Sequence, residues 1–320
     1  MDTMRAAVID RFGGPETLEL REVPVPPVAG GEVLIRVEAA GVGSWDPFER
    51  EGGYAEMQGT EPAFPYILGS EGAGTVVAVG PDVAGVAPGD RVHAAAFLNP
   101  KGGFYAEYAA VDASLVSAPP DHLTTDQAGA MPGVAVTALR GLQDVLAVQA
   151  GERLAIVGAG GGIGHVAVQL AGRLGARVLA VASGPDGVAL AEAGGADVAV
   201  DGRAVDVAAA CRAFAAHGLD AVLLTAGGPV ADAVLSCLRP DGAGRAAYPT
   251  GVMPEPAATP YNGEPDRDIL DRLDRLIGAP PPFDVHVART FPLAAAADAH
   301  RALDEHHLGK LVLHPGDSDG

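Results

Sequence analysis

Three glycines at the end of an apolar segment carry the strongest chemical signal in this chain of 320 residues. Gly158, Gly161 and Gly164 follow the apolar run 153–157 and open an apolar helical pattern. A second apolar run covers 177–182, so the unit reads as strand, glycine turn, helix and strand. Glycines at such a turn let a pyrophosphate approach the backbone, and the start of the helix offers free N–H groups. The segment predicts a dinucleotide site, the alternative being a glycine-rich turn with a structural role.

The glycine spacing is G-x-x-G-x-x-G, because position 163 is Ile and position 165 is His. With Gln169, Leu170 and Ala171 on the following helix, this pattern resembles the medium-chain dehydrogenase/reductase superfamily. The resemblance covers nearly the whole chain in an ordered series of segments: 69–76 (GSEGAGTV), 89–92 (GDRV), 103–108 (GFYAEY), 133–139 (GVAVTAL), 291–293 (FPL), 299–301 (AHR) and 309–313 (GKLVL). An ordered series is more specific than any single motif.

Two positions argue against a catalytic zinc ion. Zinc-dependent alcohol dehydrogenases of this superfamily place a Cys where this chain has Gly43, and a His where it has Ser70. Their four-cysteine structural lobe is also missing, and zinc requires thiolate, imidazole or carboxylate ligands in a defined set. The resemblance therefore narrows to the zinc-free, quinone oxidoreductase-like branch, for which no metal is expected.

The candidate catalytic residues lie in a turn that reads GVNxxDxxxRxGxY in that branch. This chain departs from the pattern at Gly43, where the Asn is missing, and at Phe48; its matching residues are Gly41, Val42, Asp46, Arg50, Gly52 and Tyr54. The missing Asn removes an amide that could contact the substrate carbonyl or the nicotinamide. This departure argues against quinones as the substrate, whereas reduction of enones in general remains an alternative.

The resemblance implies catalytic roles for Tyr54, Asp46 and Trp45. Tyr54 is the candidate proton donor, with bound or bulk water as the alternative. Trp45 and Tyr54 could instead be apolar walls of the substrate slot. Asp46 could hold the turn by accepting local backbone N–H groups, and Arg50 is expected to pair with a carboxylate.

The resemblance also implies the residues that contact the cofactor. Thr137 is expected to face the nicotinamide, and Ala226 and Gly227 to lie near its ribose. Tyr248 and Gly251 are expected to line the same groove. The pyrophosphate is expected at the glycine turn, beside Gly158, Gly161, Gly162, Ile163 and Gly164.

The cofactor is expected to be NADP, with NAD as the alternative. NAD-specific folds usually end their second strand with an acid that holds the ribose 2′-hydroxyl. Here that strand ends at Ser183, which can donate a hydrogen bond to a 2′-phosphate. A Lys common in this branch is Gly187 here, and an adenine-site Tyr is Gly202, but Arg203 could replace them as a phosphate partner.

The chain carries a formal net charge of −20, and Lys101 and Lys310 are its only lysines. A nucleic-acid partner is disfavoured, because phosphate backbones require a basic footprint. No apolar segment is long enough to span a bilayer, and no secretory leader is evident. We expect a cytoplasmic protein with a small-molecule substrate and no membrane partner. Cys211 and Cys237 lack metal-ligand spacing and are expected to be reduced thiols in predicted helices.

Two regions of different pattern must position these residues. Residues 1–120 contain β-branched segments interrupted by Gly and Pro, which predicts a mostly antiparallel β domain. Residues 123–280 alternate short apolar strands with helices, which predicts a doubly wound parallel sheet. The predicted strands are 153–157, 177–182, 197–200, 219–224 and 244–248, the helices are 163–174, 186–193, 204–216 and 229–238, and the loops are 253–260 and 279–282.

The last part of the chain is predicted as a strand at 283–291, a helix at 293–305 and a strand at 311–313. By resemblance, it returns to the first domain. The implied α/β fold combines a discontinuous GroES-like domain with a Rossmann dinucleotide-binding domain. Their expected bounds are 1–122 with 281–320, and 123–280.

These expectations lead to an NADPH-dependent, zinc-independent oxidoreductase that transfers hydride to a quinone or an activated alkene, such as an enone or enoyl-thioester. The alternative is a nucleotide-binding relative without reductase turnover, which serves as a binding module or a non-redox biosynthetic enzyme. A homodimer is expected by resemblance, paired through an open edge of the parallel sheet. That edge is predicted near 245–248.

Overall fold

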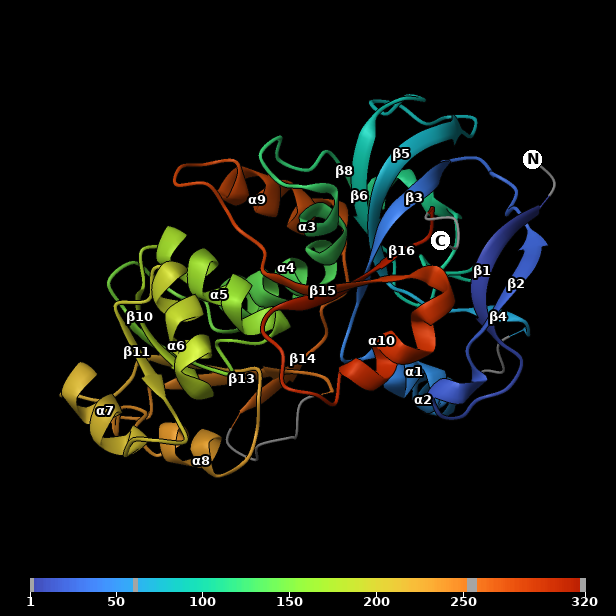
Figure 1. Cartoon of the computed structure of the whole chain (residues 1–320). Helices are drawn as coiled ribbons and strands as arrows, with labels where there is room; N and C mark the ends of the chain where they lie inside the picture. The colour runs from blue at the N-terminus through green and yellow to red at the C-terminus, as the bar shows by residue number, and fades with distance from the viewer. Residues whose placement is uncertain (1–2, 60–62, 252–257, 317–320) are drawn as a thin grey trace. The chain divides into compact units, whose positions relative to one another are not determined.

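The computed structural model describes residues 3–59, 63–251 and 258–316 (Figure 1). The chain divides into two compact units. Unit 1 consists of Met1–Gly133, Pro265–Leu270 and Val287–Gly320, and unit 2 of Val134–Glu264 and Asp271–His286. The chain therefore leaves unit 1 for unit 2, returns to unit 1 for Pro265–Leu270, adds Asp271–His286 to unit 2 and ends in unit 1.

Unit 1 is built on two sheets. A small antiparallel sheet has the order β2-β1-β4, formed by β1 (Thr3–Ile9), β2 (Glu19–Pro24) and β4 (Tyr66–Ile67). The larger sheet has the order β15-β16-β3-β5-β6-β8, with β7 paired to β3. Its strands are β3 (Glu32–Val42), β5 (Glu71–Val79), β6 (Arg91–Ala95), β7 (Tyr108–Asp112), β8 (Val116–Ser117), β15 (Val287–Pro292) and β16 (Lys310–His314).

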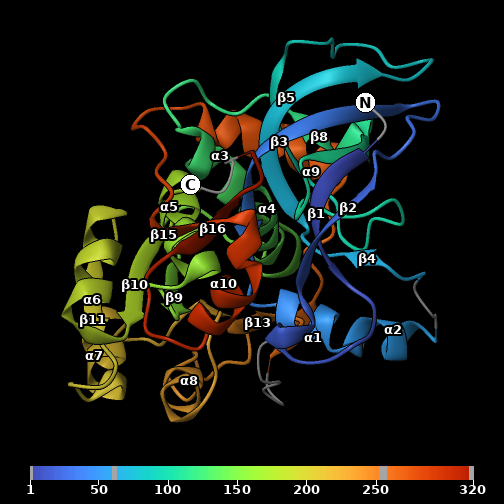
Figure 2. The same cartoon turned by 45° about the vertical axis from the view of Figure 1, so that its right-hand side comes forward.

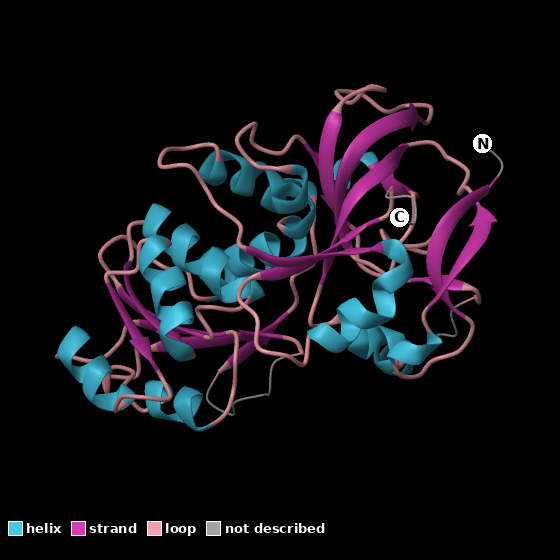
Figure 3. Cartoon of the chain, viewed as in Figure 1, coloured by secondary structure: helices cyan, strands magenta, loops and turns pink. Residues whose placement is uncertain are grey.

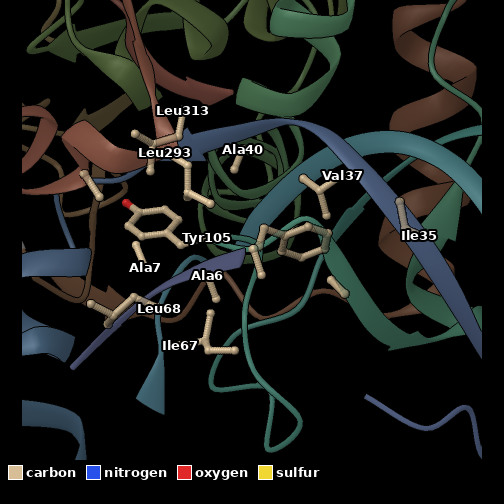
Figure 4. Packing of buried hydrophobic residues seen from close by; sticks show 14 of the residues in the cluster. Ala6, Ala7, Ile35, Val37, Ala40, Ile67, Leu68, Tyr105, Leu293 and Leu313 are labelled. Carbon is tan, nitrogen blue, oxygen red and sulfur yellow. The ribbon is translucent and has the colours of Figure 1, made fainter. Parts of the chain in front are cut away.

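Strand β3 is the centre of unit 1, because it pairs with β5, β7 and β16. Its apolar residues Val33, Ile35 and Val37 are buried, as expected for a strand of β-branched residues. They join an apolar cluster that includes Tyr105, whose ring lies with Leu293 and Leu313 on one side and Ala7 and Leu68 on the other (Figure 4). The predicted β domain is confirmed, and it includes the returning C-terminal segment.

Short helices complete unit 1. They are α1 (Asp46–Arg50), α2 (Gly53–Gln58), α3 (Thr125–Ala130) and α10 (Ala296–Ala302). Helices α1 and α10 are far apart in the sequence but lie side by side (Figures 1 and 2), joined by a 2.8 Å hydrogen bond between Arg50 Nη1 and His300 Nδ1. Single-turn 3₁₀ segments lie at Pro15–Thr17, Ala113–Leu115 and Leu293–Ala295. The sequence analysis did not predict α1 and α2, which are too short to show a periodic pattern.

Unit 2 is a parallel sheet of order β11-β10-β9-β12-β13-β14. Its strands are β9 (Arg153–Val157), β10 (Arg177–Ala182), β11 (Val198–Asp201), β12 (Ala221–Leu224), β13 (Arg245–Pro249) and β14 (Thr259–Tyr261). Its helices include α5 (Gly162–Arg173), α6 (Gly184–Ala193), α7 (Val207–Phe214) and α8 (Pro229–Leu235). Helices α7 and α8 pack on one face, and α5 and α6 lie on the other (Figure 3). The predicted doubly wound sheet is confirmed.

Two predictions about the end of this sheet are corrected. The edge expected near 245–248 is wrong, because β13 is covered by β14 through the pairs Ala247–Thr259 and Pro249–Tyr261. Most of the predicted loop 253–260 lies outside the described residues, but its end, Thr259 and Pro260, belongs to β14. A strand of three residues that contains a proline gives no alternating signal in the sequence.

The remaining helical segments are α4 (Pro132–Leu139), a π-helical turn at Arg140–Val145 and α9 (Arg267–Ile277). The sequence analysis made no prediction for α9. The predicted strand 283–291 begins later, as β15, and the predicted helix 293–305 is shorter, as α10 after a 3₁₀ turn. Cys211 lies on α7 and is buried, whereas Cys237 lies beyond the end of α8 and is partly exposed. No helix among the described residues is long and apolar enough to cross a membrane.

Candidate active site

The glycine turn of unit 2 is shaped by close contacts of its own backbone. Gly158 has φ +84°, which L side chains rarely adopt, and a Cβ there would lie 2.6 Å from Thr225 Oγ1. A Cβ on Gly164 would overlap the carbonyl oxygen of Gly158. Both positions therefore require glycine for the strand β9 to pass directly into helix α5.

Gly161 differs from these two glycines. Its φ is −84°, and the nearest atom to a Cβ there would be Gly158 O at 3.4 Å, an ordinary contact. Gly161 is exposed and is the N-cap of α5, so it offers no side-chain acceptor to the first N–H groups of that helix. Such a helix start can bind a phosphate through those N–H groups and its partial positive charge. The turn fits the pyrophosphate of a dinucleotide, with Gly162 and Ile163 in the first turn of α5.

The structure brings Ser183 and Arg203 to one edge of the sheet, because β10 and β11 are paired through Ala182 and Asp201. Ser183 is exposed and caps the start of α6 without a side-chain hydrogen bond. Asp201 Oδ1 accepts the backbone N–H groups of Arg203 (2.9 Å) and Gly184 (3.1 Å), which lower the pKa of its carboxyl. Sequence reasoning missed Asp201, which ends the neighbouring strand and not the one that carries the usual ribose-binding acid.

The other predicted cofactor residues lie at strand ends or on a helix of unit 2. Ala226 and Gly227 directly follow β12, and Tyr248 lies buried in β13. Gly251 follows β13 with φ +101°. Thr137 lies on α4 and is buried, and a Cβ on Gly263 would overlap its hydroxyl. The role of these residues toward a cofactor stays a prediction.

In unit 1, Trp45 occupies the space above Gly43. A Cβ at position 43 would overlap the indole ring, and the indole Nε1 donates a 3.2 Å hydrogen bond to Ser70 Oγ. The ring also packs edge-on against Phe97, with centroids 5.7 Å apart. Gly43 and Ser70 stand at the two positions where zinc-dependent relatives carry ligands, and both contact Trp45. The absence of an Asn at position 43 has a structural reason, because its side chain would displace Trp45.

A buried ion pair lies beneath Trp45. Lys310 Nζ lies 2.8 Å from Glu71 Oε1, donates to Val42 O at 2.8 Å, and lies 4.9 Å from the centroid of the Trp45 ring. Both charged side chains are buried. The strand register explains the meeting, because β16 pairs with the end of β3 through Leu311 and Val42. The sequence analysis quoted both residues within motifs but did not pair them.

Glu71 also holds the start of helix α4. Its Oε2 accepts the N–H of Gly133 at 2.7 Å. A Cβ on Gly41 would lie 2.5 Å from Glu71 Oε1, so glycine at position 41 leaves room for the carboxylate. Glycines at positions 41, 43 and 133 thus make space for the Glu71 and Trp45 side chains.

Asp46 lies at the end of a chain of hydrogen bonds in unit 1 that begins at Arg50 and passes through His300 and Tyr105. Its Oδ2 accepts the Gly43 N–H at 2.8 Å and the Tyr105 hydroxyl at 2.7 Å. Arg50 can only donate to His300 Nδ1, so the proton of a neutral His300 lies on Nε2, which donates to Tyr105 Oη at 3.2 Å. Burial lowers the pKa of His300 to about 3, so the ring is neutral. Asp46 holds the turn, which was one of its two predicted roles.

Arg50 pairs with a carboxylate, as predicted, but it also has two other hydrogen-bond partners. It is buried and pairs with the exposed carboxylate of Glu51 at 2.5 Å, but it also donates to Gly13 O at 2.9 Å and to His300. These bonds tie helix α1 to the N-terminal sheet region and to α10. Arg50 is therefore a structural residue of unit 1.

A second acidic side chain, Glu49, lies one helical turn from Asp46 and was not singled out by the sequence analysis. It is buried, and its Oε1 accepts the hydroxyl of Tyr66. Burial, and then Asp46, raise the pKa of Glu49 to about 8. Burial also raises the pKa of Asp46 to about 6, although the bond from Tyr105 acts in the opposite direction. A lone Glu within a short helical turn resembles any surface residue in sequence, so nothing indicated this burial.

Tyr54 lies on α2, the helix that follows α1 in the chain. Its ring packs edge-on against Phe48, with centroids 4.9 Å apart. The phenol is partly buried, and burial, followed by Glu49 and Asp46, raises its pKa to about 12. Tyr54 is thus a protonated phenol at neutral pH. Among the described residues, no three His, Cys, Asp or Glu side chains gather so that they could hold a metal ion.

Comparison with known proteins agrees with this fold. Residues 29–121 match the family model described as the alcohol dehydrogenase GroES-like domain, and residues 162–257 match the model described as zinc-binding dehydrogenase. A mycobacterial protein, Rv1454c, solved in complex with NADPH, is 30% identical and has a TM-score of 0.81; the match covers 98% of this chain and 100% of that one. The chain belongs to the medium-chain dehydrogenase/reductase superfamily.

The names of individual relatives refer to several different activities. The human quinone oxidoreductase is 37% identical over 185 residues, 58% of this chain and 54% of that protein, so the match spans about half of the relative. The pikromycin polyketide synthase component PikAII of Streptomyces venezuelae is 36% identical over 307 residues, 90% of this chain but 8% of that protein. A structure titled NAD-dependent alcohol dehydrogenase is 30% identical, with a TM-score of 0.86 and coverage of 98% and 100%. These matches support an oxidoreductase of this superfamily.

Proposed function

We propose that this protein is an NADPH-dependent, zinc-independent oxidoreductase that reduces a quinone or an activated alkene. The observation that carries the proposal is the arrangement of Trp45, which lies over Gly43, donates to Ser70 and covers the ion pair of Lys310 and Glu71. That part of unit 1 is filled with an indole and a neutralised lysine. Among the described residues, no group of side chains could hold a metal ion that would polarise the substrate.

The cofactor, when bound, supplies a hydride. Unit 2 would hold its pyrophosphate at the turn Gly158–Gly164, and Ser183 and Arg203 would contact a 2′-phosphate. The bound NADPH of the mycobacterial relative supports this choice, whereas the relative named an NAD-dependent dehydrogenase keeps NAD as the alternative. Asp201 orients the backbone beside Ser183 and Arg203, and its charge would have to be balanced by Arg203.

Tyr54 is the proposed proton donor of the reaction. Reduction of an alkene adds a hydride at the β-carbon and a proton at the α-carbon, and reduction of a quinone adds the proton to oxygen. A phenol with a pKa of about 12 keeps its proton at neutral pH and can give it to a stronger base, such as a carbanion or enolate. Water remains the alternative donor. Trp45 would form an apolar wall beside the substrate.

The test is whether NADPH absorbance falls when quinones, enones and enoyl-thioesters are added in turn. NADPH carrying deuterium at C4 should place deuterium on the β-carbon of an enone product. Tyr54→Phe should lower the rate by about a hundredfold if the phenol is the donor, and only slightly if water is. Elemental analysis should find no stoichiometric zinc. Bound NADPH without oxidation by any acceptor would favour the second candidate, a nucleotide-binding relative without reductase turnover.

We also propose that the protein is a cytoplasmic homodimer. In the part of the chain that the structure describes, β14 is the last strand at one end of the parallel sheet, and an open edge favours pairing with a second copy. Light scattering of the purified protein should give twice the mass of one chain. Replacing Thr259 by Pro should shift the protein toward monomers if this edge forms the contact.

A further inference from the structure

His165 is a buried histidine on α5, the helix that begins at the glycine turn. The sequence analysis used it only to exclude one glycine spacing. Its ring nitrogen Nε2 lies 3.2 Å from the backbone nitrogen of His286, and Nδ1 lies 2.9 Å from the carbonyl oxygen of Gly161. A backbone N–H can only donate, so Nε2 is the acceptor, and the ring proton lies on Nδ1, which donates to Gly161.

The segment 284–286 holds the ring of His165 in this orientation. Gln169, one turn further along α5, donates to the carbonyl oxygen of Asp284 at 2.8 Å and accepts the Asp284 N–H at 2.9 Å. All of these residues belong to unit 2. The segment is therefore held along α5 at two points, and the N–H of His286 keeps Nδ1 of the ring directed at the glycine turn.

The carbonyl of Gly161 receives two donors from the same residue. Besides the ring Nδ1, the backbone N–H of His165 donates to it at 3.1 Å, as expected for the carbonyl of an N-cap residue. In a planar trans peptide, the C=O and the following N–H point in opposite directions. A Gly161 carbonyl that is held against the helix therefore directs the N–H of Gly162 away from the helix, toward the expected position of the pyrophosphate.

The first N–H groups of α5 are available to a ligand. Those of Gly162 and Ile163 have no hydrogen-bond partner among the described residues, as is usual for the start of a helix. A donor that is already oriented loses less conformational freedom when it binds a phosphate than one that must first be ordered. The bond from His165 supplies this orientation before the cofactor arrives.

Resting on the proposed function, we propose that His165 is a positioning residue for cofactor binding. Its Nδ1–H holds the peptide between Gly161 and Gly162 so that the Gly162 N–H is directed at the pyrophosphate of NADPH. His165 does not itself contact the cofactor in this arrangement. A histidine buried for packing alone would contribute to stability but not to affinity, so measurements of the two properties separate these roles.

Two substitutions separate the hydrogen bond from the packing. His165→Leu keeps an apolar side chain in the buried space and loses both ring bonds, whereas His165→Asn loses the bond to His286 but retains an amide that can donate to Gly161 O. Both variants should melt at a lower temperature than the wild type. His165→Leu should bind NADPH about tenfold more weakly, the effect of one hydrogen bond, and His165→Asn should stay within about twofold of the wild type.

A matched control lies one turn further along the same helix. Gln169→Leu removes the two bonds to Asp284 but none to the glycine turn, so it should lower the melting temperature and leave the Kd for NADPH unchanged. Adenosine 2′-phosphate lacks the pyrophosphate and should bind the wild type and His165→Leu equally. In turnover, His165→Leu should raise KM for NADPH and leave kcat unchanged.

The position of the ring proton can be measured in the wild-type protein alone. Nitrogen-15 spectra of labelled histidine should show His165 with its proton on Nδ1, and this signal should be missing in both variants at position 165. The measurement tests the bond to Gly161 even if His165→Leu fails to fold. A proton on Nε2 would overturn the inference.

The outcomes separate the two proposals. Equal NADPH affinity of His165→Leu and the wild type, in a protein that reduces an acceptor, would overturn the inference and leave the proposed function intact. An affinity lost in His165→Leu and not restored in His165→Asn would assign the effect to packing and would also overturn it. Variants that behave as expected, in a protein whose NADPH no acceptor oxidises, would contradict the reductase function and support the positioning role.

Discussion

The glycine turn of unit 2 and the buried charged cluster of unit 1, which consists of Asp46, Glu49, Glu71 and Lys310, are built in different ways. At the turn, chemistry is offered by backbone N–H groups, and the residues matter because they lack side chains: Gly158 and Gly164 make room for the chain itself. In the cluster, chemistry is offered by buried side chains that come from distant segments, as the ion pair of Lys310 and Glu71 does. A backbone site is local in sequence, whereas a side-chain site depends on strand register.

The largest expected effect tests the roles of the glycines at the turn. Gly164→Val should abolish folding of unit 2, because its Cβ would overlap Gly158 O. Gly161→Val should fold with nearly unchanged melting temperature but lose NADPH binding, since only the pyrophosphate would meet its side chain. Circular dichroism and fluorescence titration with NADPH measure the two properties. A folded Gly161→Val variant with full NADPH affinity would contradict the assignment.

The next effect tests the ion pair of the cluster. Lys310→Met leaves Glu71 buried without its cation and should reduce the free energy of unfolding by about 3–5 kcal/mol. Adding Glu71→Gln should restore part of this loss, because Gln can still accept the Gly133 N–H without a charge. Urea unfolding of both variants measures the difference. A double variant less stable than Lys310→Met alone would show that the two residues act independently.

A smaller effect tests whether Trp45 and position 43 compete for space. Gly43→Asn, which restores the residue usual in the zinc-free branch, should destabilise the protein by about 1–3 kcal/mol because it overlaps Trp45. In a Trp45→Ala background the same change should cost much less. A double-mutant cycle from unfolding data gives the coupling. Equal costs in the two backgrounds would mean that the ring moves away freely.

The smallest effect is the pH dependence of stability that Glu49 contributes. The pKa of Glu49 is raised from an ordinary value of 4.5 to about 8 in the fold, so between these values the native state binds a proton that the unfolded chain has lost. Its contribution is therefore fully present below pH 4.5 and declines as pH rises to about 8. Each tenfold difference in proton affinity corresponds to about 1.4 kcal/mol.

Glu49→Gln cannot lose that proton, so its melting temperature should fall less than that of the wild type between pH 5 and pH 8. Glu56→Gln, at an exposed position, should follow the wild type. Parallel slopes for all three proteins would show that Glu49 is charged in the native state across this range.

The same contrast explains which parts could be predicted. The Rossmann strands and the helices 163–174 and 229–238 were predicted because each is a continuous apolar or periodic segment. The edge near 245–248 was wrong, because β14 is a short, proline-containing strand whose pairing with β13 depends on tertiary structure. Helix α1 and the residue Glu49 were missed, since a helix of five residues leaves no period and burial of a charge has no local signature. Helix α9 was missed although Ile269, Leu270, Leu273 and Ile277 recur at helical spacing along its eleven residues.

The sequence by itself determined the superfamily, the two kinds of sheet and the glycines that shape the turn between β9 and α5. All of these depend on residue type and spacing within one segment. Only the tertiary structure decided that Trp45 fills the space over Gly43, that Lys310 pairs with Glu71, and that Glu49 is buried beside Asp46. The physical reason is that electrostatic free energies depend on burial and distance, and both are set by the register of β3, β5 and β16 and by the packing of α1 against α10.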